Sequence, residues 1–270
     1  MEKINRLLKQ IEEIVNDETP QDAPQEWQAG VDLGTADIVV LVVDGQGQPA
    51  AAFLEWAEVV RDGVVLDYWG AVQIVKKHLA KAEQKLNIKI EKAVTSYPPG
   101  TDPQISKNVI EAAGLDVSEI IDEPSSIIHL LDLKEGAVAD VGGGTTGIAL
   151  VNRGEIIYTA DEPTGGRHVS LVIAGHHKIP FEEAEEMKRN GSAESLLPAA
   201  DPVFRKISDI IREHLSGRSV KKLYISGGTA LFPNMEKILA EELPEMEIIM
   251  PYNPLYLTPL AVASYRGKNG

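Results

Sequence analysis

The spacing of hydrophobic residues changes several times along the chain, and the first stretch has the period of a helix. Apolar residues recur at every third or fourth position over residues 1–16, with charged residues between them, which predicts an amphipathic helix. Residues 17–28 are polar and include Pro20 and Pro24, a composition typical of a linker. We therefore expect this helix to be separate from the main fold.

Two similar hairpins are predicted far apart in the chain. Short apolar runs of strand character end at turn signals, Asp44-Gly45 in the first hairpin and Asn152-Arg153-Gly154 in the second. The predicted strands of the two hairpins cover residues 38–43, 50–56, 137–141, 148–151 and 155–158. The remaining predicted helices and strands alternate and cover residues 72–86, 93–94, 103–113, 181–189, 202–215, 223–226 and 234–243. This alternation predicts an α/β fold.

Composition excludes several classes of function. A formal net charge of -15 and only 5% aromatic residues argue against a nucleic-acid partner. The chain has no cysteine, which excludes disulfides and thiolate metal sites. No apolar run is long enough for a signal peptide or an integral membrane segment, so the expected location is cytoplasmic.

The two hairpins carry the candidate chemistry, because each begins with the same unit. Asp32 precedes Gly34-Thr35, and Asp140 precedes a glycine run that ends in Thr145. Glycines let the backbone turn sharply and leave amides facing outward, and threonine hydroxyls add donors for phosphate oxygens. The candidate phosphate-binding residues are Gly34, Thr35, Gly142, Gly143, Gly144 and Thr145.

The two aspartates need a cation if phosphates lie beside them. Carboxylates and phosphates repel each other, so we expect Asp32 and Asp140 to approach a hydrated Mg²⁺. The alternative is that each Asp-x-Gly forms only a turn, which the duplication disfavours. Gly142-x-Gly144-x-x-Gly147 also matches a dinucleotide-binding motif, but the residues after it predict a strand where that motif needs a helix.

With these motifs the chain resembles the superfamily of actin, DnaK-type chaperones, MreB and FtsA, over about residues 30–265. In this resemblance Gly227 and Gly228 belong to the loop that holds adenosine. The resemblance implies a duplicated two-lobe, actin-like (ribonuclease H-like) ATPase fold that binds ATP or ADP with Mg²⁺ between its lobes. It divides the chain into a helix and linker (1–26), a first lobe (27–133 with 252–270) and a second lobe (134–251).

The resemblance also assigns roles to single residues. Glu123 is expected to orient the attacking water, with Asp140 and Thr145 as further catalytic residues; the alternative for Glu123 is an acid at the start of a helix, before Pro124. Ribose and adenine contacts are expected from Glu185 and Lys188, and the nucleotide is also expected to lie beside Gly165 and Gly166. For Glu185 and Lys188, the alternative is a solvated helix face with charge pairs.

Within the superfamily the chain is most similar to the EutJ family of ethanolamine utilisation. This implies a chaperone-like or reactivating accessory, with an ethanolamine-utilisation enzyme or a microcompartment shell protein as partner. Peripheral insertions are short, and no lysine matches the catalytic lysine of DnaK-type chaperones. We therefore expect slow ATP hydrolysis, with a non-catalytic nucleotide-binding switch or scaffold as the alternative and a small-molecule kinase ranked last.

Two further features have more than one interpretation. The amino-terminal helix could pack on the body, associate with a membrane or dock a partner; its balanced charge disfavours a membrane, and packing ranks ahead of docking. His168, His176 and His177 could suggest a metal site, but adjacent histidines cannot usually reach one ion together, so no metal is expected there.

Overall fold

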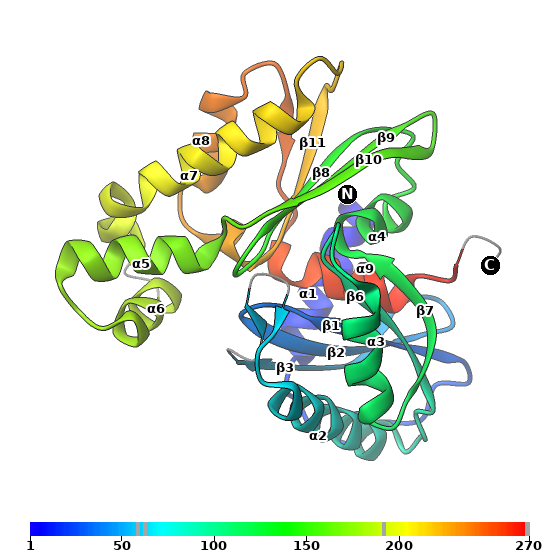
Figure 1. Ribbon diagram of the computed structural model, residues 1–270. Coiled ribbons are helices and arrows are strands. Elements are labelled where there is room, and N and C mark those ends of the chain that lie inside the picture. Colours follow the sequence, from blue (N-terminus) through cyan, green and yellow to red (C-terminus); the bar gives the residue numbers. More distant parts are fainter. Residues whose placement is uncertain (58–59, 62–63, 191–192, 268–270) are drawn as a thin grey trace.

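Two five-stranded mixed sheets form the cores of two lobes (Figure 1). The computed structural model describes residues 1–57, 60–61, 64–190 and 193–267. In each sheet three antiparallel strands are followed by two strands that run parallel to the first. This arrangement makes the fold α/β, as the alternation of strand and helix patterns predicts.

The first sheet has the strand order β3-β2-β1-β6-β7. Its strands are β1 (Trp27–Leu33), β2 (Asp37–Asp44), β3 (Pro49–Trp56), β6 (Lys92–Tyr97) and β7 (Asp116–Asp122). Helices α2 (Tyr68–Leu86) and α3 (Pro103–Ala112) cover one face and bury aliphatic side chains of β1, β2 and β3. The predicted first hairpin is therefore confirmed.

The second sheet repeats that order as β10-β9-β8-β11-β12. Its strands are β8 (Glu135–Val141), β9 (Thr146–Asn152), β10 (Glu155–Glu162), β11 (Lys222–Ser226) and β12 (Glu247–Ile249). Its helices are α5 (Gly166–His177), α6 (Phe181–Arg189), α7 (Ala193–Leu215) and α8 (Met235–Glu242). The hairpin prediction is confirmed here too, and the repeated topology shows that the two lobes are internal duplicates.

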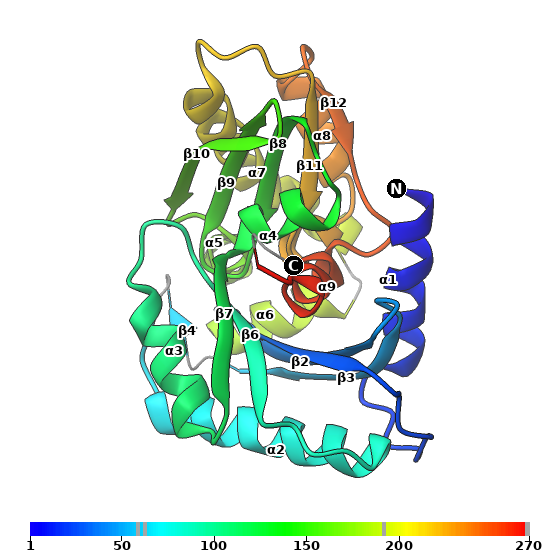
Figure 2. The same ribbon diagram turned by 90° about the vertical axis from the view of Figure 1, so that its right-hand side faces the viewer.

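Two helices lie between the sheets and join the lobes (Figure 2). They are α4 (Glu123–Leu130) and α9 (Leu257–Ser264), the latter preceded by the 3-10 turn η2 (Pro254–Tyr256). Their apolar side chains share one buried cluster with residues from both sheets. An ideal Cβ on Gly30 of β1 would lie 2.5 Å from backbone atoms of Ala263, so α9 packs directly on the first sheet.

The amino-terminal helix α1 (Glu2–Ile14) packs on the first lobe, which confirms the interpretation ranked first for it and corrects the expectation, drawn from the polar segment that follows, that it would be separate. Leu8 and Ile11 are fully buried against β3 and its neighbours. The polar segment after the helix is also held, because the buried Lys85 donates from Nζ to the Asp17 side chain at 2.7 Å. The apolar face of α1 is thus part of the core, and Figure 2 shows the helix along one side of the molecule.

Truncating Leu8 is expected to destabilise the protein. Leu8→Ala leaves a cavity at a fully buried site, which typically costs about 2–5 kcal/mol. Urea unfolding followed by far-UV circular dichroism measures the change, with Lys9→Ala, on the exposed side of the same helix, as the control. Equal stability of the two variants would contradict the packing of α1 seen here.

Several elements differ from the sequence-based expectations. Helix α5 was not predicted, because Gly165-Gly166 was interpreted as a loop alone, and α7 begins well before residue 202 and contains Pro198 and Pro202. Strands β7 and β12 also escaped prediction; β7 is largely exposed and β12 has three residues. Among the residues that the structure describes between β3 and α2, the strands are the short β4 (Val60–Arg61) and β5 (Val64–Val65).

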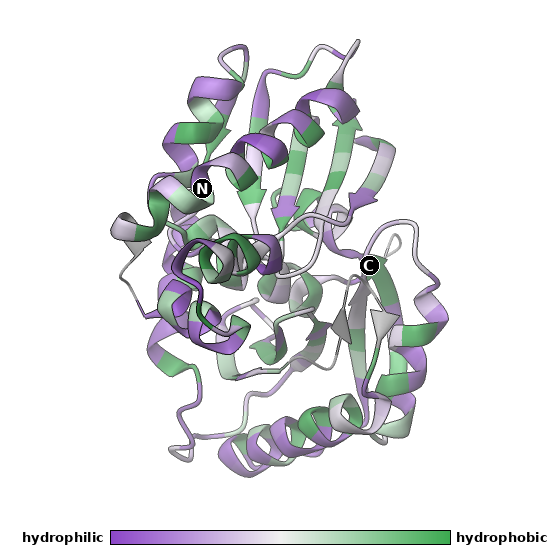
Figure 3. Ribbon diagram, turned by 60° about the vertical axis from the view of Figure 1, so that its left-hand side comes forward, coloured by the Kyte–Doolittle hydropathy of each residue, from purple (hydrophilic) through white to green (hydrophobic). Residues whose placement is uncertain are grey.

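Hydropathy follows this layering (Figure 3). Hydrophobic segments concentrate in the strands, and the helices alternate between hydrophobic and hydrophilic residues. Among the described residues, no helix is both long and apolar enough to cross a bilayer.

Candidate functional site

The two glycine turns face each other across the space between the lobes. The first connects β1 to β2 and the second connects β8 to β9. Because β9 is a strand, the Gly142-x-Gly144-x-x-Gly147 segment opens a hairpin, which rules out the dinucleotide-binding arrangement. The turns meet closely, since an ideal Cβ on Gly143 would lie 2.6 Å from the Cβ of Ala36.

A cavity of about 310 Å³ lies between these turns. Twelve of the predicted site residues line it, namely Asp32, Gly34, Thr35, Glu123, Asp140, Gly142, Gly143, Thr145, Glu185, Lys188, Gly227 and Gly228. Gly144, Gly165 and Gly166 do not line it. The sequence-predicted residues are therefore brought together with three exceptions.

The two aspartates of the duplicated motif are buried and held by hydroxyl groups. Ser96 donates to Oδ1 of Asp32 at 2.6 Å, and Thr258 donates to Oδ2 of Asp140 at 2.6 Å. Burial raises the pKa of Asp32 to about 6 and that of Asp140 to about 7, because desolvation disfavours the charged carboxylate. Their mutual repulsion raises the pKa of Asp140 further.

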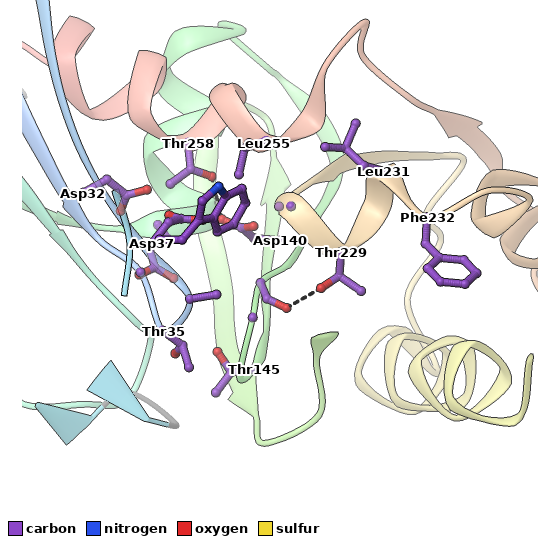
Figure 4. A pocket seen from close by; sticks show the side chains of 18 of the residues that line it. Asp32, Thr35, Asp37, Asp140, Thr145, Thr229, Leu231, Phe232, Leu255 and Thr258 are labelled. Carbon is purple, nitrogen blue, oxygen red and sulfur yellow. Dashed lines mark hydrogen bonds between the residues drawn. The ribbon is translucent and has the colours of Figure 1, made fainter. Parts of the chain in front are cut away.

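Two more carboxyl groups line the same end of the cavity (Figure 4 labels Asp37). Burial raises the pKa of Asp37 to about 7, and the charge of Asp32 adds to this. Burial also raises the pKa of Glu123 well above its usual range, with added repulsion from Asp32 and Asp140. This end of the cavity therefore concentrates negative charge.

Positive charge among the described lining residues is confined to Lys188 and Arg189, both on α6, and the charge of Arg189 partly offsets the rise in the pKa of Asp37. No group of three or more His, Cys, Asp or Glu side chains among the described residues is arranged to hold a metal by itself. The carboxylates of Asp32 and Asp140 fit a hard cation that keeps most of its water, as Mg²⁺ does. A bound cation of this kind would relieve the charge repulsion.

Of the three glycines outside the lining, Gly144 belongs to the second turn, and Gly165 and Gly166 pack against that turn. Gly166 donates its amide to the Gly142 carbonyl at 3.0 Å, and the hydroxyl of Thr229 donates to the same carbonyl at 2.7 Å (Figure 4). An ideal Cβ on Gly165 would lie 2.9 Å from the backbone carbonyl carbon of Gly144, so a side chain has no room there. These glycines therefore shape the turn and do not face the cavity.

Glu185, Lys188 and Arg189 of α6 form a group of ion pairs that lines the cavity. Glu185 accepts from Lys188 at 2.7 Å and from Arg189 at 2.9 Å, and the charge of Lys188 helps to keep the pKa of Glu185 low despite its burial. The guanidinium of Arg189 lies 4.4 Å from the ring centre of Trp56, which belongs to the other lobe. Side chains of both lobes thus meet beside this group of ion pairs.

Sequence reasoning missed several lining residues. Asp37, Trp56, Arg189 and Thr258 line the cavity but were not among the predicted site residues. Asp37 and Arg189 adjoin predicted residues in sequence and could have been found by that proximity. Trp56 and Thr258 come from the end of a strand and from a distant helix, and only the fold brings them here.

The raised pKa values predict how stability depends on pH. A carboxyl group whose pKa is higher in the folded state favours folding most below its unfolded pKa near 4, and this contribution is lost as pH rises to about 7. We expect the nucleotide-free protein to lose stability between about pH 4 and pH 7, by about 1.4 kcal/mol per unit of pKa shift. Urea unfolding at several pH values measures this; Asp140→Asn should flatten the profile, and an unchanged slope would contradict the assignment.

Comparisons with known proteins agree with this geometry. The family model described as cell division protein FtsA matches residues 137–261. The ethanolamine utilization protein EutJ of Salmonella typhimurium is 47% identical over 92% of this chain and 88% of its own length. A crystal structure of EutJ from Carboxydothermus hydrogenoformans is 39% identical, with a TM-score of 0.90 over 98% of this chain and 99% of that one. A PilM-PilN type IV pilus biogenesis complex shares the fold at a TM-score of 0.71 and 14% identity, over 87% of this chain and 97% of that one.

Proposed function

This chain belongs to the EutJ family of actin-like ethanolamine utilization proteins, and we propose that it binds ATP or ADP with Mg²⁺ between its lobes and hydrolyses ATP slowly. One observation carries the proposal. Four carboxyl groups, the buried Asp32 and Asp140 and the half-buried Asp37 and Glu123, line the cavity beside two glycine turns whose amides suit phosphate oxygens. Such a site is favourable only when a cation accompanies the phosphates.

In this proposal each part of the cavity has a separate task. The amides of the two turns, with Thr35 and Thr145, hold the phosphates. Asp32 and Asp140 would hold the water shell of Mg²⁺, and Asp140 would contribute to catalysis through that cation. Thr145 and the glycine amides would stabilise charge during transfer. The magnesium ion, when bound, neutralises phosphate charge.

Glu123 is the proposed acceptor for the proton of the attacking water. It lies at the first turn of α4 and faces the cavity from the hinge between the lobes. Asp122 caps this helix by accepting from the Ser125 amide at 3.0 Å, and Pro124 occupies a first-turn position, so the start of the helix is firmly placed. General-base catalysis needs a carboxylate that is held within hydrogen-bonding distance of the attacking water.

The distribution of cations supports slow turnover. Among the described lining residues, the two cations, Lys188 and Arg189, are both ion-paired with Glu185, which reduces the positive charge that they offer to a transferred phosphate. The same feature favours the second candidate, a nucleotide-dependent switch or scaffold without catalysis. Both candidates use the same binding site and differ only in whether phosphate is released.

We further propose that lobe rotation on nucleotide binding serves a partner in ethanolamine utilisation. The partner would be an enzyme of that process or a microcompartment shell protein, and the role would be that of a chaperone-like or reactivating accessory. The proposed boundaries are a first lobe over 27–133 with 252–270 and a second lobe over 134–251, with residues 1–26 as a helix and linker. Because the apolar face of α1 is buried, any docking by that helix would use its polar face.

A two-step assay tests this proposal. Calorimetric titration with ATP in the presence of Mg²⁺ measures binding, and phosphate release from the same preparation measures hydrolysis. Binding with slow release supports the ATPase. Binding without release selects the switch, and the absence of binding rejects both.

A further inference from the structure

A row of three residues crosses the second sheet at the site. Asp140 of β8 is paired with Gly147 of β9, and Gly147 is paired with Asp161 of β10. Residues directly opposite each other on neighbouring strands point their side chains to the same face of the sheet. The Asp161 carboxylate therefore lies on the same face as that of Asp140, about 10 Å along the row because strands are about 4.8 Å apart.

The duplicated lobe shows that this row departs from ordinary packing. The matching row of the first sheet runs from Asp32 through Val39 to Leu54. Val39 and Leu54 are buried in the apolar cluster between the lobes. The second lobe has a glycine and a second aspartate at the same two places, so it keeps an acidic group where packing alone would favour an aliphatic one.

Glu123 lies over the middle of the row. Helix α4 packs against β8, β9 and β10. An ideal Cβ on Gly147 would lie 3.4 Å from Cδ of Pro124, the residue that follows Glu123. Burial raises the pKa of Glu123, and the charges of Asp32, Asp140 and Asp161 add to this rise. Oδ1 of Asp161 is buried.

We propose that Asp161 is a positioning residue for the proposed ATP hydrolysis, acting through Glu123 on the attacking water. The inference rests on the function proposed above. Asp161 approaches Glu123 from the side opposite Asp140, across the place left open by Gly147. From that position the Asp161 carboxylate keeps the Glu123 carboxyl group on the side of the row where the phosphates would lie. The water whose proton Glu123 accepts is thereby held on the same side.

Asp161→Asn tests this role with a change that keeps the size of the side chain. We expect kcat for phosphate release to fall about tenfold, as is typical when a carboxylate that orients a functional group is lost, and KM for Mg-ATP to stay within twofold. The acid limb of the pH profile of kcat should move to lower pH, because removing the Asp161 charge lowers the pKa of Glu123. Asp161→Glu keeps the charge, so it should keep the position of that limb even where kcat falls.

Glu162→Gln is the matched control. Glu162 is the next residue on β10, so its side chain points to the other face, where its Oε1 lies 3.1 Å from Nε2 of His214. The Glu162→Gln substitution removes one negative charge from the same strand. It should leave kcat and the acid limb of the pH profile unchanged. If Asp161→Asn behaves like Glu162→Gln, or if it alters only the melting temperature, the inference is overturned. If the unmodified protein binds Mg-ATP without releasing phosphate, the hydrolysis proposal fails first and this inference fails with it.

Discussion

Glu123→Gln is expected to lower the rate of phosphate release by roughly 10²–10⁴-fold, the usual contribution of a general base. Glutamine has the size of glutamate but cannot accept a proton at neutral pH. The start of α4 should keep its structure, because Asp122 and Pro124 define it independently of the Glu123 side chain. The loss should therefore appear in kcat.

ATP affinity should be retained or slightly increased in the same variant. Glu123 is one of four carboxyl groups that crowd one end of the cavity, so removing its charge reduces repulsion of the phosphates. Single-turnover phosphate release measures the chemical step, and calorimetry measures affinity. Unchanged release would show that Glu123 is only a residue at a helix start, and lost affinity would place it among the binding residues.

Gly227→Ala is expected to have the largest effect on the fold of the site. Gly227 has φ +90°, and an added Cβ would overlap the carbonyl of Val141 and lie 2.6 Å from Oδ1 of Asp140. Both Val141 and Asp140 belong to the central strand β8, which cannot move aside easily. We expect a loss of more than about 3 kcal/mol of unfolding free energy, together with loss of ATP binding.

Gly47→Ala separates the clash from the backbone strain. Gly47 has φ +77°, close to that of Gly227, but an added Cβ there would meet no atom within 4 Å. This control should cost only about 1 kcal/mol, the penalty for a side chain in the left-handed region. Urea unfolding of both variants measures the difference. Equal losses of unfolding free energy would show that the overlap with β8 does not destabilise the protein.

Local signals in the sequence were sufficient for the two hairpins and their glycine turns. Turn residues at 44–45 and 152–154 and the apolar runs beside them act within a few residues, so they can be recognised without the fold. The repetition of Asp32 and Gly34-Thr35 by Asp140 and Gly144-Thr145 then indicated one shared site. The structure places both turns on one cavity.

What the sequence could not provide depends on tertiary contacts. Thr258 reaches Asp140 from 118 positions away, and Trp56 meets Arg189 across the cleft. The buried Lys85 fixes the segment after α1 through Asp17, which composition alone marked as a free linker. The role proposed for Asp161 can be inferred only from its strand register with Gly147 and Asp140.

The dependence of ATP affinity on Mg²⁺ tests the central claim most directly. Crowded carboxylates around a phosphate-binding turn predict that ATP binds at least about 100-fold more tightly with Mg²⁺ than with EDTA, a difference of about 2.7 kcal/mol. Asp140→Asn should shrink this ratio by raising affinity without magnesium and lowering it with magnesium. Calorimetric titration of ATP under the two conditions gives the ratio. A ratio of about 100 or more agrees with a magnesium-nucleotide clamp between the lobes, and a ratio near one would contradict it.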